Sequence, residues 1–226
     1  WESVKAILAD LDEAELAVSQ GSQRALGRLS VTAPTWFSSP FFARILATFQ
    51  QAYPQVELDL DLRDRLVDIV EEGYDLALRV LRDAPPSLLS RRLADIQFLL
   101  VAAPSLMRKP LRHFSSLQGY PWLDYAYVEE SGRLSQGEET VQLRPALRSN
   151  STSLLRDAAV AGMGLALLPQ PLVLEDLRAE RLVIVLPQYT WPTLGLYGVY
   201  SSRRFLSTRV QVFLQHLQAA TISQTL

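Results

Sequence analysis

The chain has 226 residues, of which 48% are hydrophobic and 20% are charged, so it holds enough apolar material for one large core or two small ones and is not a disordered chain. Its 22 basic and 24 acidic residues give a formal net charge of −2, which argues against a nucleic-acid surface spread over this sequence. The absence of cysteine excludes disulfides, thiolate metal sites and cysteine nucleophiles. Because there is also no long apolar run and no signal-peptide pattern, we expect a soluble, cytoplasmic α/β protein.

The first 20 residues predict a helix, because they contain good helix formers and neither proline nor glycine. Their apolar positions lie alternately three and four residues apart, as in the seam of a short coiled coil. These positions are Val4, Ile7, Leu11, Ala14 and Val18. A surface helix packed on its own domain, with Leu8 and Leu16 widening the stripe, fits equally well. Since the chain begins at Trp1, we expect a further segment N-terminal to it.

The next segment predicts a strand, a loop and a helix in succession. Apolar and polar side chains alternate over 29–33, in a strand that ends at Pro34. A polar loop over 35–39 leads to Pro40, a residue that suits the first turn of a helix. Apolar residues then recur at helical spacing over 41–53.

Residues 56–62 alternate between apolar and acidic side chains, which predicts a strand with one buried and one wet face at the edge of a sheet. A helix that closes at Gly73 should follow. Its inward residues are Leu66, Ile69 and Val70. With the strand expected over 76–80, these elements form a βαβαβ unit, so we expect a parallel sheet with right-handed crossovers.

The second half of the chain repeats the alternation of strands and helices. A continuous apolar run over 96–102 predicts a buried strand, and the polar tract 129–137 predicts a mobile loop or a hairpin tip. Ser149 to Thr152 offer a choice of caps for a helix that ends at Gly162. Further strands are expected over 122–127, 141–148, 165–168, 182–186 and 194–200, and helices over 172–177 and at the C-terminus, where Val210, Phe213, Leu214 and Leu217 share a face. Two α/β units in series predict two lobes with a cleft between them.

The motifs of common enzymes are missing or misplaced. There is no G-x-S-x-G elbow, no phosphate-binding loop and no pair of histidines at metal-ligand spacing. The glycines at 162 and 164 follow a helix and precede a strand, the reverse of a dinucleotide fingerprint, so they predict a turn. His113 and His216 indicate solvated or capping roles. The acidic pairs at 71–72, 129–130 and 138–139 are interpreted as solvated or flexible, so we expect no catalytic residue and no metal site.

Two junctions between a strand and a helix carry a stronger site signal. They span 34–39 and 149–151, and ligands of open α/β sheets bind beyond the carboxyl ends of the strands. Both offer hydroxyl groups, backbone N–H groups and the positive end of a helix dipole, which suit a carboxylate or a similar anion. Arg79 should lie at the same rim. Each junction alone could be a simple helix cap, but their occurrence in both lobes favours a binding cleft.

An ordered set of short motifs resembles the effector-binding domain of LysR-type transcriptional regulators. The motifs are GRLSVTAP at 27–34, Phe49 with Tyr53-Pro54, EGYDLALR at 72–79, AAPS at 102–105, Ser149-Asn150, GMGLALLP at 162–169 and the run 182–187. No single motif is specific, but the ordered set over about residues 25–220 is. The resemblance implies an α/β, periplasmic-binding-protein-like fold, with two Rossmann-like lobes and a cleft between them.

The resemblance also implies a division of the chain. Residues 1–25 would form the C-terminal part of the dimerisation linker helix. Residues 26–101 together with 206–226 would form lobe I, and residues 102–205 would form lobe II. The family's N-terminal winged helix-turn-helix domain would be absent from this chain.

The inducer-contacting loops of the family map onto three segments of this sequence. They carry Thr35, Trp36, Phe37 and Ser38, then Arg79 and Val80, then Ser149, Asn150 and Ser151. Trp36 and Phe37 are bulkier than the residues of many relatives, which favours a small or aromatic effector. We expect this effector to be anionic or polar, and we expect no cofactor.

The expected protein partner is a second copy of the chain, in a dimer or tetramer. The resemblance implies that strand 56–62 and helix 41–53 of one copy meet helix 151–161 of the other. DNA would be contacted only through the absent N-terminal domain, and no membrane partner is expected. Two readings from other classes stay open at this point, a solute-binding protein of the same fold and a deaminase-like enzyme.

Overall fold

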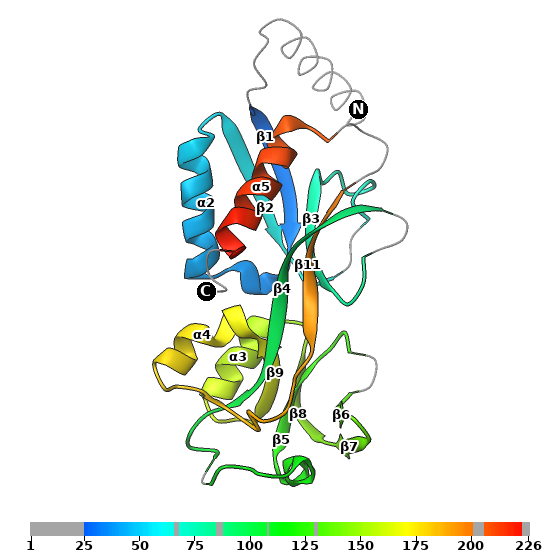
Figure 1. Ribbon diagram of the computed structural model, residues 1–226, viewed down its shortest axis with the longest axis vertical. Helices are drawn as coiled ribbons and strands as arrows, with labels where there is room; N and C mark the ends of the chain where they lie inside the picture. Colours follow the sequence, from blue (N-terminus) through cyan, green and yellow to red (C-terminus); the bar gives the residue numbers. More distant parts are fainter. Residues whose placement is uncertain are drawn as a thin grey trace, which may run out of the picture.

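The computed structural model describes residues 25–65, 68–84, 88–107, 109–128, 131–200 and 206–222. The helix predicted over 1–20 lies outside the described residues. Figure 1 shows two lobes stacked along the long axis of the molecule and joined by two long strands. A single nine-stranded sheet passes through both lobes in the order β2-β1-β3-β11-β4-β9-β5-β8, with β10 paired to β4.

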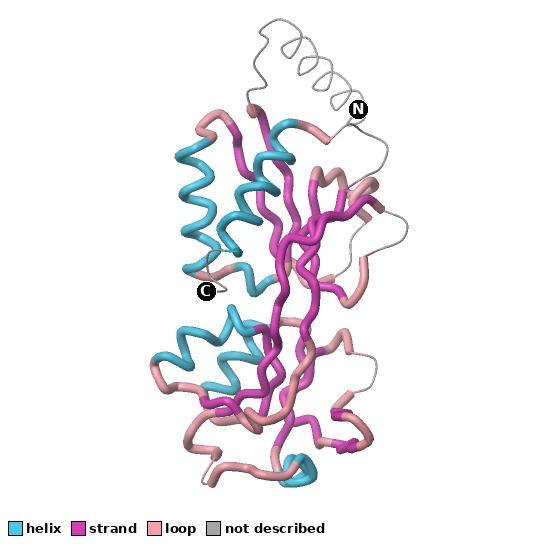
Figure 2. The backbone as a smooth tube through the Cα atoms, in the orientation of Figure 1, coloured by secondary structure: helices cyan, strands magenta, loops and turns pink. Residues whose placement is uncertain are grey.

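Lobe I is built on three parallel strands. They are β1 (Gly27–Ala33), β2 (Val56–Leu62) and β3 (Leu76–Leu81), with β1 in the middle. The predicted edge position of the strand 56–62 is confirmed, because β2 ends the sheet order. The helix α2 (Pro40–Ala52) connects β1 to β2 and packs against the C-terminal helix α5 (Thr208–Ile222). In Figure 2 these two helices lie side by side next to the strands of lobe I.

The helix predicted to close at Gly73 is wrong over the described residues, which form a single turn before β3. The side chain of Asp68 accepts the backbone N–H groups of Val70 and Glu71 at 2.9 and 3.0 Å, which satisfies that turn locally without a continuing helix. Gly73 ends the turn at a φ of 74°, as predicted for a residue in the C′ position. The turn covers the sheet face opposite α2, because Ile69 packs with residues of β3 and β11 there.

Two antiparallel strands connect the lobes. They are β4 (Leu89–Ala102) and β11 (Thr193–Tyr200). In lobe I, β11 pairs with β3, and in lobe II, β4 pairs with β9. The strand β4 begins at Leu89, before the predicted run 96–102. The sequence did not predict its first half, because the residues there are mostly polar and partly exposed and form no apolar run. Gln97 fastens the crossing, where its amide donates to the Trp191 carbonyl at 2.9 Å and accepts from the Thr193 hydroxyl at 2.7 Å.

Lobe II is built on a second set of parallel strands. Its strands are β5 (Pro121–Tyr125), β8 (Arg144–Ser149), β9 (Leu165–Pro169) and β10 (Val183–Ile184), its helices are α3 (Thr152–Val160) and α4 (Gln170–Arg178), and η2 (Phe114–Gly119) is a 3-10 helix. The strand β5 lies between β8 and β9 and is parallel to both. The strands β6 (Arg133–Gln136) and β7 (Glu139–Gln142) form a hairpin, which is the hairpin alternative predicted for 129–137.

Two strands of lobe II are shorter than the sequence predicts. The strand expected over 122–127 ends at Tyr125, and residues 126–127 form a turn. The strand expected over 182–186 pairs only over Val183–Ile184. Its apolar run continues to Leu186, but that residue has a φ of 53°, a left-handed conformation that ends the extended backbone. Val185 and Leu186 are apolar because they are buried, and not because they belong to a strand.

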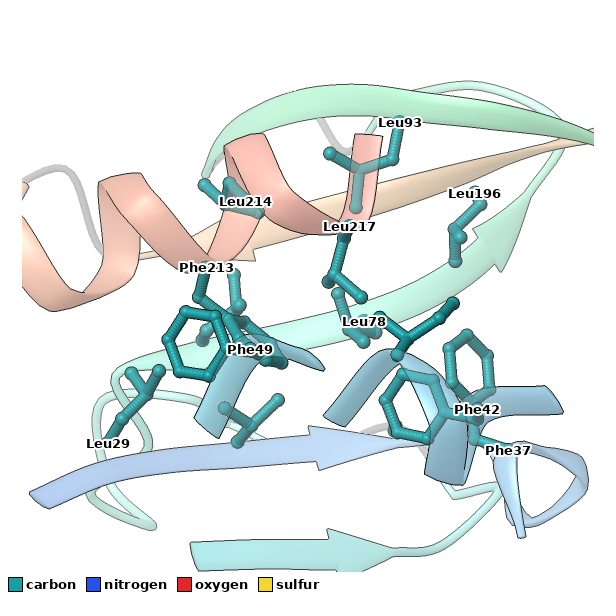
Figure 3. Packing of buried hydrophobic residues seen from close by; sticks show 14 of the residues in the cluster. Leu29, Phe37, Phe42, Phe49, Leu78, Leu93, Leu196, Phe213, Leu214 and Leu217 are labelled. Atoms are coloured by element: carbon teal, nitrogen blue, oxygen red, sulfur yellow. The ribbon is translucent and has the colours of Figure 1, made fainter. Parts of the chain in front are cut away.

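The core of lobe I lies between the sheet and the helices α2 and α5 (Figure 3). Phe49 of α2 and Phe213 of α5 meet edge to face with ring centroids 4.9 Å apart, a favoured aromatic arrangement. Leu29 and Leu78 lie beneath them on the sheet. Leu172 of α4 packs against this core and against a core of lobe II, so the two lobes touch through apolar side chains.

Candidate functional site

The first predicted site segment is the turn between β1 and α2. Residues Thr35–Phe37 form a 3-10 turn, η1, and the exposed Ser38 donates its backbone N–H to the Thr35 carbonyl at 3.0 Å. Ser39 caps α2, because its hydroxyl accepts the backbone N–H of Phe42 at 3.3 Å. Pro40 occupies the first turn, so the predicted start of this helix is confirmed.

Asp64 occupies both hydrogen-bond donors of Thr35. The parallel register sets Ala33 beside Leu62, so Asp64 arrives level with Thr35 two residues later. The Thr35 backbone N–H donates to Asp64 Oδ1 at 2.8 Å, and its hydroxyl donates to Oδ2 at 2.7 Å. We expected the backbone N–H groups of this junction to be free for a ligand. This expectation is wrong at Thr35, because the Asp64 carboxylate already accepts its N–H.

Trp36 and Phe37 belong to the core of lobe I. Their side chains are buried, and their ring centroids lie 4.4 Å apart. The ring of Phe37 also meets Phe42 edge to face at 4.6 Å. Both aromatic rings thus anchor η1 in the core of lobe I. Their contact with a ligand stays a prediction.

Arg79 of β3 holds a buried positive charge. Its residue exposure is 7%. Nη1 donates to the Leu78 carbonyl at 2.8 Å, and Nη2 donates to the Thr32 hydroxyl at 3.1 Å, so both partners are neutral. Burial lowers the pKa of Arg79 and the charge of Asp64 opposes this, but a guanidinium remains protonated in either case. Among the residues that the structure describes, Arg79 forms no ion pair, and a buried cation of this kind is a favourable position for an anion. The next residue, Val80, is half-buried against the core of lobe I.

The second predicted segment is the start of α3. Ser151 is the N-cap, because its hydroxyl accepts the backbone N–H of Leu154 at 3.2 Å. The Ser149 hydroxyl accepts the Ser151 backbone N–H at 3.0 Å. Asn150 is exposed between them and is not the cap. The three predicted residues therefore divide into two that build the turn and one whose side chain is available.

Thr152 adds a polar group that the sequence reasoning missed. It is the first residue of α3, its exposure is 8%, and its hydroxyl oxygen is buried without a hydrogen-bond partner. Buried hydroxyls are nearly always hydrogen-bonded, so an unsatisfied one indicates a position for a further partner. At this end of the helix the backbone N–H groups also favour an acceptor.

The structure brings the first segment against the helix that follows the second segment. The turn η1 of lobe I contacts α3 of lobe II. Tyr125 ends β5 beside Ser149 in the parallel register. Burial raises the pKa of the Tyr125 phenol, the charge of Asp64 raises it further, and the charge of Arg79 lowers it, so the phenol lies within electrostatic reach of both. The arrangement therefore combines a guanidinium, a carboxylate, a phenol and a helix N-terminus.

Three residues of this arrangement were not predicted, namely Asp64, Tyr125 and Thr152. Extending the register of strands 29–33 and 56–62 by two residues would have found Asp64. Tyr125 could not be predicted as a site residue, because the sequence does not indicate that β5 ends there. Thr152 was counted among possible caps, and no local sequence pattern shows that it is buried.

Other reactive residues have structural roles. His216 of α5 is hydrogen-bonded through Nε2 to the Thr48 hydroxyl at 2.9 Å and lies 3.2 Å from the Ile45 carbonyl, so it links α5 to α2. Gly162 has a φ of 80° in the turn between α3 and β9, as predicted.

Within the described ranges, no group of three or more acidic or histidine side chains could hold a metal ion. No helix among those ranges is long and apolar enough to cross a membrane.

Comparison with known proteins identifies the class of this arrangement. Residues 22–221 match the family model described as the LysR substrate binding domain. The chain is 30% identical over 225 residues to the HTH-type transcriptional regulator DmlR of Escherichia coli K12, covering 96% of this chain and 73% of that protein. It is 28% identical over 218 residues to PtxR of Pseudomonas aeruginosa, covering 94% and 70%.

Solved structures agree with the fold. The regulatory domain of CrgA, a LysR-type transcriptional regulator from Neisseria meningitidis, matches with a TM-score of 0.77 and 25% identity, covering 87% of this chain and 99% of that domain. The regulatory domain of AphB from Vibrio vulnificus has the same fold, with a TM-score of 0.67 and 24% identity over 86% and 98%. These proteins are regulators and not enzymes. The chain therefore belongs to the LysR substrate-binding domain family, the effector-binding regulatory domains of LysR-type transcriptional regulators, with a periplasmic-binding-protein-like fold.

Proposed function

We propose that this chain senses a small polar or anionic molecule that binds between its two lobes, and that binding modulates the DNA binding of the regulator. The observation that carries this proposal is the meeting of η1 and α3 across the lobes, next to the buried guanidinium of Arg79. A ligand held there touches both lobes at once. Its binding energy can therefore depend on how the lobes are arranged.

The effector would contact the residues mapped from the family. In lobe I these are Thr35, Trp36, Phe37, Ser38, Arg79 and Val80, and in lobe II they are Ser149, Asn150 and Ser151. Because the donors of Thr35 already bind Asp64, we place the acceptor groups of the effector nearer to Arg79 and Asn150. The exposed amide of Asn150 is the side chain of the second segment that is best placed to reach a ligand.

A ligand shifts a protein between two arrangements only by its different affinity for them. Here β4 and β11 pass through both lobes, so a change of angle between the lobes has to be taken up in these strands. We propose that the regulator is a homo-oligomer, dimer or tetramer, in the cytoplasm, and that the lobe angle changes how its copies pack. The DNA contact would belong to a segment outside this chain, since 22 basic and 24 acidic residues give no excess of positive charge.

The test is a thermal-shift screen of this chain against organic acids and neutral metabolites, followed by calorimetry on the wild type and Asn150→Ala. We expect a compound that stabilises the wild type, and we expect Asn150→Ala to weaken its binding by roughly 1–3 kcal/mol, the cost of a lost hydrogen bond. Equal stabilisation of both proteins would remove Asn150 from the site. A screen in which no metabolite binds would contradict the proposed function.

A further inference from the structure

The site between the lobes contains the carboxylate of Asp64 and the guanidinium of Arg79, and these two groups are not paired with each other. Asp64 bonds to Thr35, and Arg79 bonds to a carbonyl and a hydroxyl. No ion pair between Asp64 and Arg79 forms among the described residues, although their charges interact. The two charges are therefore separate features that a ligand meets at different points.

The region around Arg79 has unused donors. A guanidinium has five N–H groups, and Arg79 uses one from each terminal nitrogen on neutral oxygens. Across the lobe boundary, α3 contacts η1, and the first residue of this helix, Thr152, carries a buried hydroxyl without a hydrogen-bond partner. A carboxylate is the small group whose charge and two oxygens suit such donors.

The region around Asp64 has the opposite preference. Each of its oxygens accepts one hydrogen bond from Thr35, which leaves further lone pairs on both. A ligand hydroxyl or ammonium group could donate to them. A second ligand carboxylate would instead meet a like charge at the Thr35 junction, where the donors that could hold it are already used.

We infer that this site, if it is the effector site proposed above, selects a monocarboxylate that also carries a hydrogen-bond donor, such as a hydroxy acid or an amino acid, and rejects dicarboxylates. Asp64 is the residue that determines this specificity. The carboxylate of the ligand goes to Arg79 and the start of α3, and its donor goes to Asp64. Tyr125, protonated at neutral pH, can bond to the ligand without adding charge.

Calorimetry on wild-type protein with acids of matched carbon number tests the inference directly. The panel holds plain monocarboxylates, 2-hydroxy monocarboxylates, amino acids and dicarboxylates. We expect the hydroxy or amino acids to bind at least about tenfold more tightly than the dicarboxylates, since like-charge contacts are strongly unfavourable.

Asp64→Asn then removes the charge and keeps the shape. The asparagine oxygen can still accept the Thr35 N–H, and the Thr35 hydroxyl can accept from its amide, so the turn should persist. We expect this variant to lose most of the discrimination against dicarboxylates. The control Asp59→Asn removes a half-exposed carboxylate of β2, which pairs with Arg28, and should leave the ranking unchanged.

Three outcomes would overturn the inference. In the first, dicarboxylates bind the wild type as tightly as the hydroxy or amino acids. In the second, Asp64→Asn leaves the ranking of the acids unchanged. In the third, no acid of the panel binds. If Asp64→Asn fails to fold, the wild-type ranking alone decides. A neutral metabolite, or a dicarboxylate, whose binding depends on Asn150 would overturn the inference and leave the proposed function standing.

Discussion

Asp176 of α4 is a fully buried charge that fastens two helices of lobe II, with an exposure of 0%. Arg156 of α3 donates to both of its oxygens, at 2.5 and 2.8 Å, and Arg181 donates to Oδ1 at 2.8 Å. The hydrogen bond to Asp176 also raises the pKa of Arg156. Asp176→Ala removes these charge-assisted hydrogen bonds, while the two arginines, with side chains 30% and 48% exposed, keep their contact with water. We expect the variant to lower the free energy of unfolding by about 1.5–3 kcal/mol in urea denaturation.

Asp157 provides a matched control, because it bonds to the same Arg156 but is 62% exposed. An exposed ion pair contributes little, so Asp157→Ala should change the free energy of unfolding by less than about 1 kcal/mol. Similar losses for the two variants would show that burial does not set the strength of these pairs. The comparison also tests whether the start of α3 depends on its anchoring to α4.

At the scale of single residues, the sequence predicted the positions of polar residues at strand ends better than the hydrogen bonds that they make. Arg79 and the turn at 149–151 were named from such positions, and the structure has Arg79 in β3 and Ser149 at the end of β8, beside Tyr125. Their role in binding stays a prediction. The occupation of Thr35 by Asp64 was missed, because it depends on a register between two strands that no local pattern encodes.

The start of α3 contains a structural residue and a proposed binding residue within one turn. Ser151 caps the helix through its hydroxyl, and Asn150 makes no cap. We expect Ser151→Ala to lower the free energy of unfolding by about 1 kcal/mol, the usual loss for an N-cap serine. Asn150→Ala, an exposed position, should change it by less than about 0.5 kcal/mol. Urea denaturation of both variants checks this, and a larger loss for Asn150→Ala would mean that the cap is assigned to the wrong residue.

At the scale of elements, the predictions succeeded where one local force dominates. Strict alternation over 56–62 was enough to place β2 at an edge, because only an edge strand leaves a whole acidic face in water. The proline and serine before α2 fixed its first turn. The helix expected before Gly73 failed, because the side chain of Asp68 takes the N–H groups that a helix would pair with carbonyls.

At the scale of the whole molecule, two lobes could be predicted from two α/β units in series, but the way they are joined could not. The strand β11 pairs along its whole length with residues 89–97 of β4, although about ninety residues separate the two strands in sequence. Such pairing depends on the global fold and leaves no periodic signal. The predicted lobe boundaries and the segment 1–25 stay predictions.

The proposed pairing of lobe I with the partner's lobe II makes α3 part of an interface. Leu154 supports this, because it is 50% exposed on α3 while Leu155 and Ala159 of the same helix are buried. Apolar residues at the centre of an interface contribute most of its energy. We expect the wild-type chain to be a dimer or higher oligomer, and Leu154→Glu to raise the dissociation constant about tenfold or more, as measured by sedimentation equilibrium.

Ile184 of β10 supplies the control, since it is 42% exposed but lies outside the proposed interface. The same change there, Ile184→Glu, adds an equal charge to an equally apolar surface position and should leave the oligomer intact. A monomeric wild type, or equal weakening by both variants, would contradict the proposed arrangement. Because the effector is proposed to act on the lobe angle, and α3 lies both at the site and at this interface, a ligand that binds there should also shift the dissociation constant.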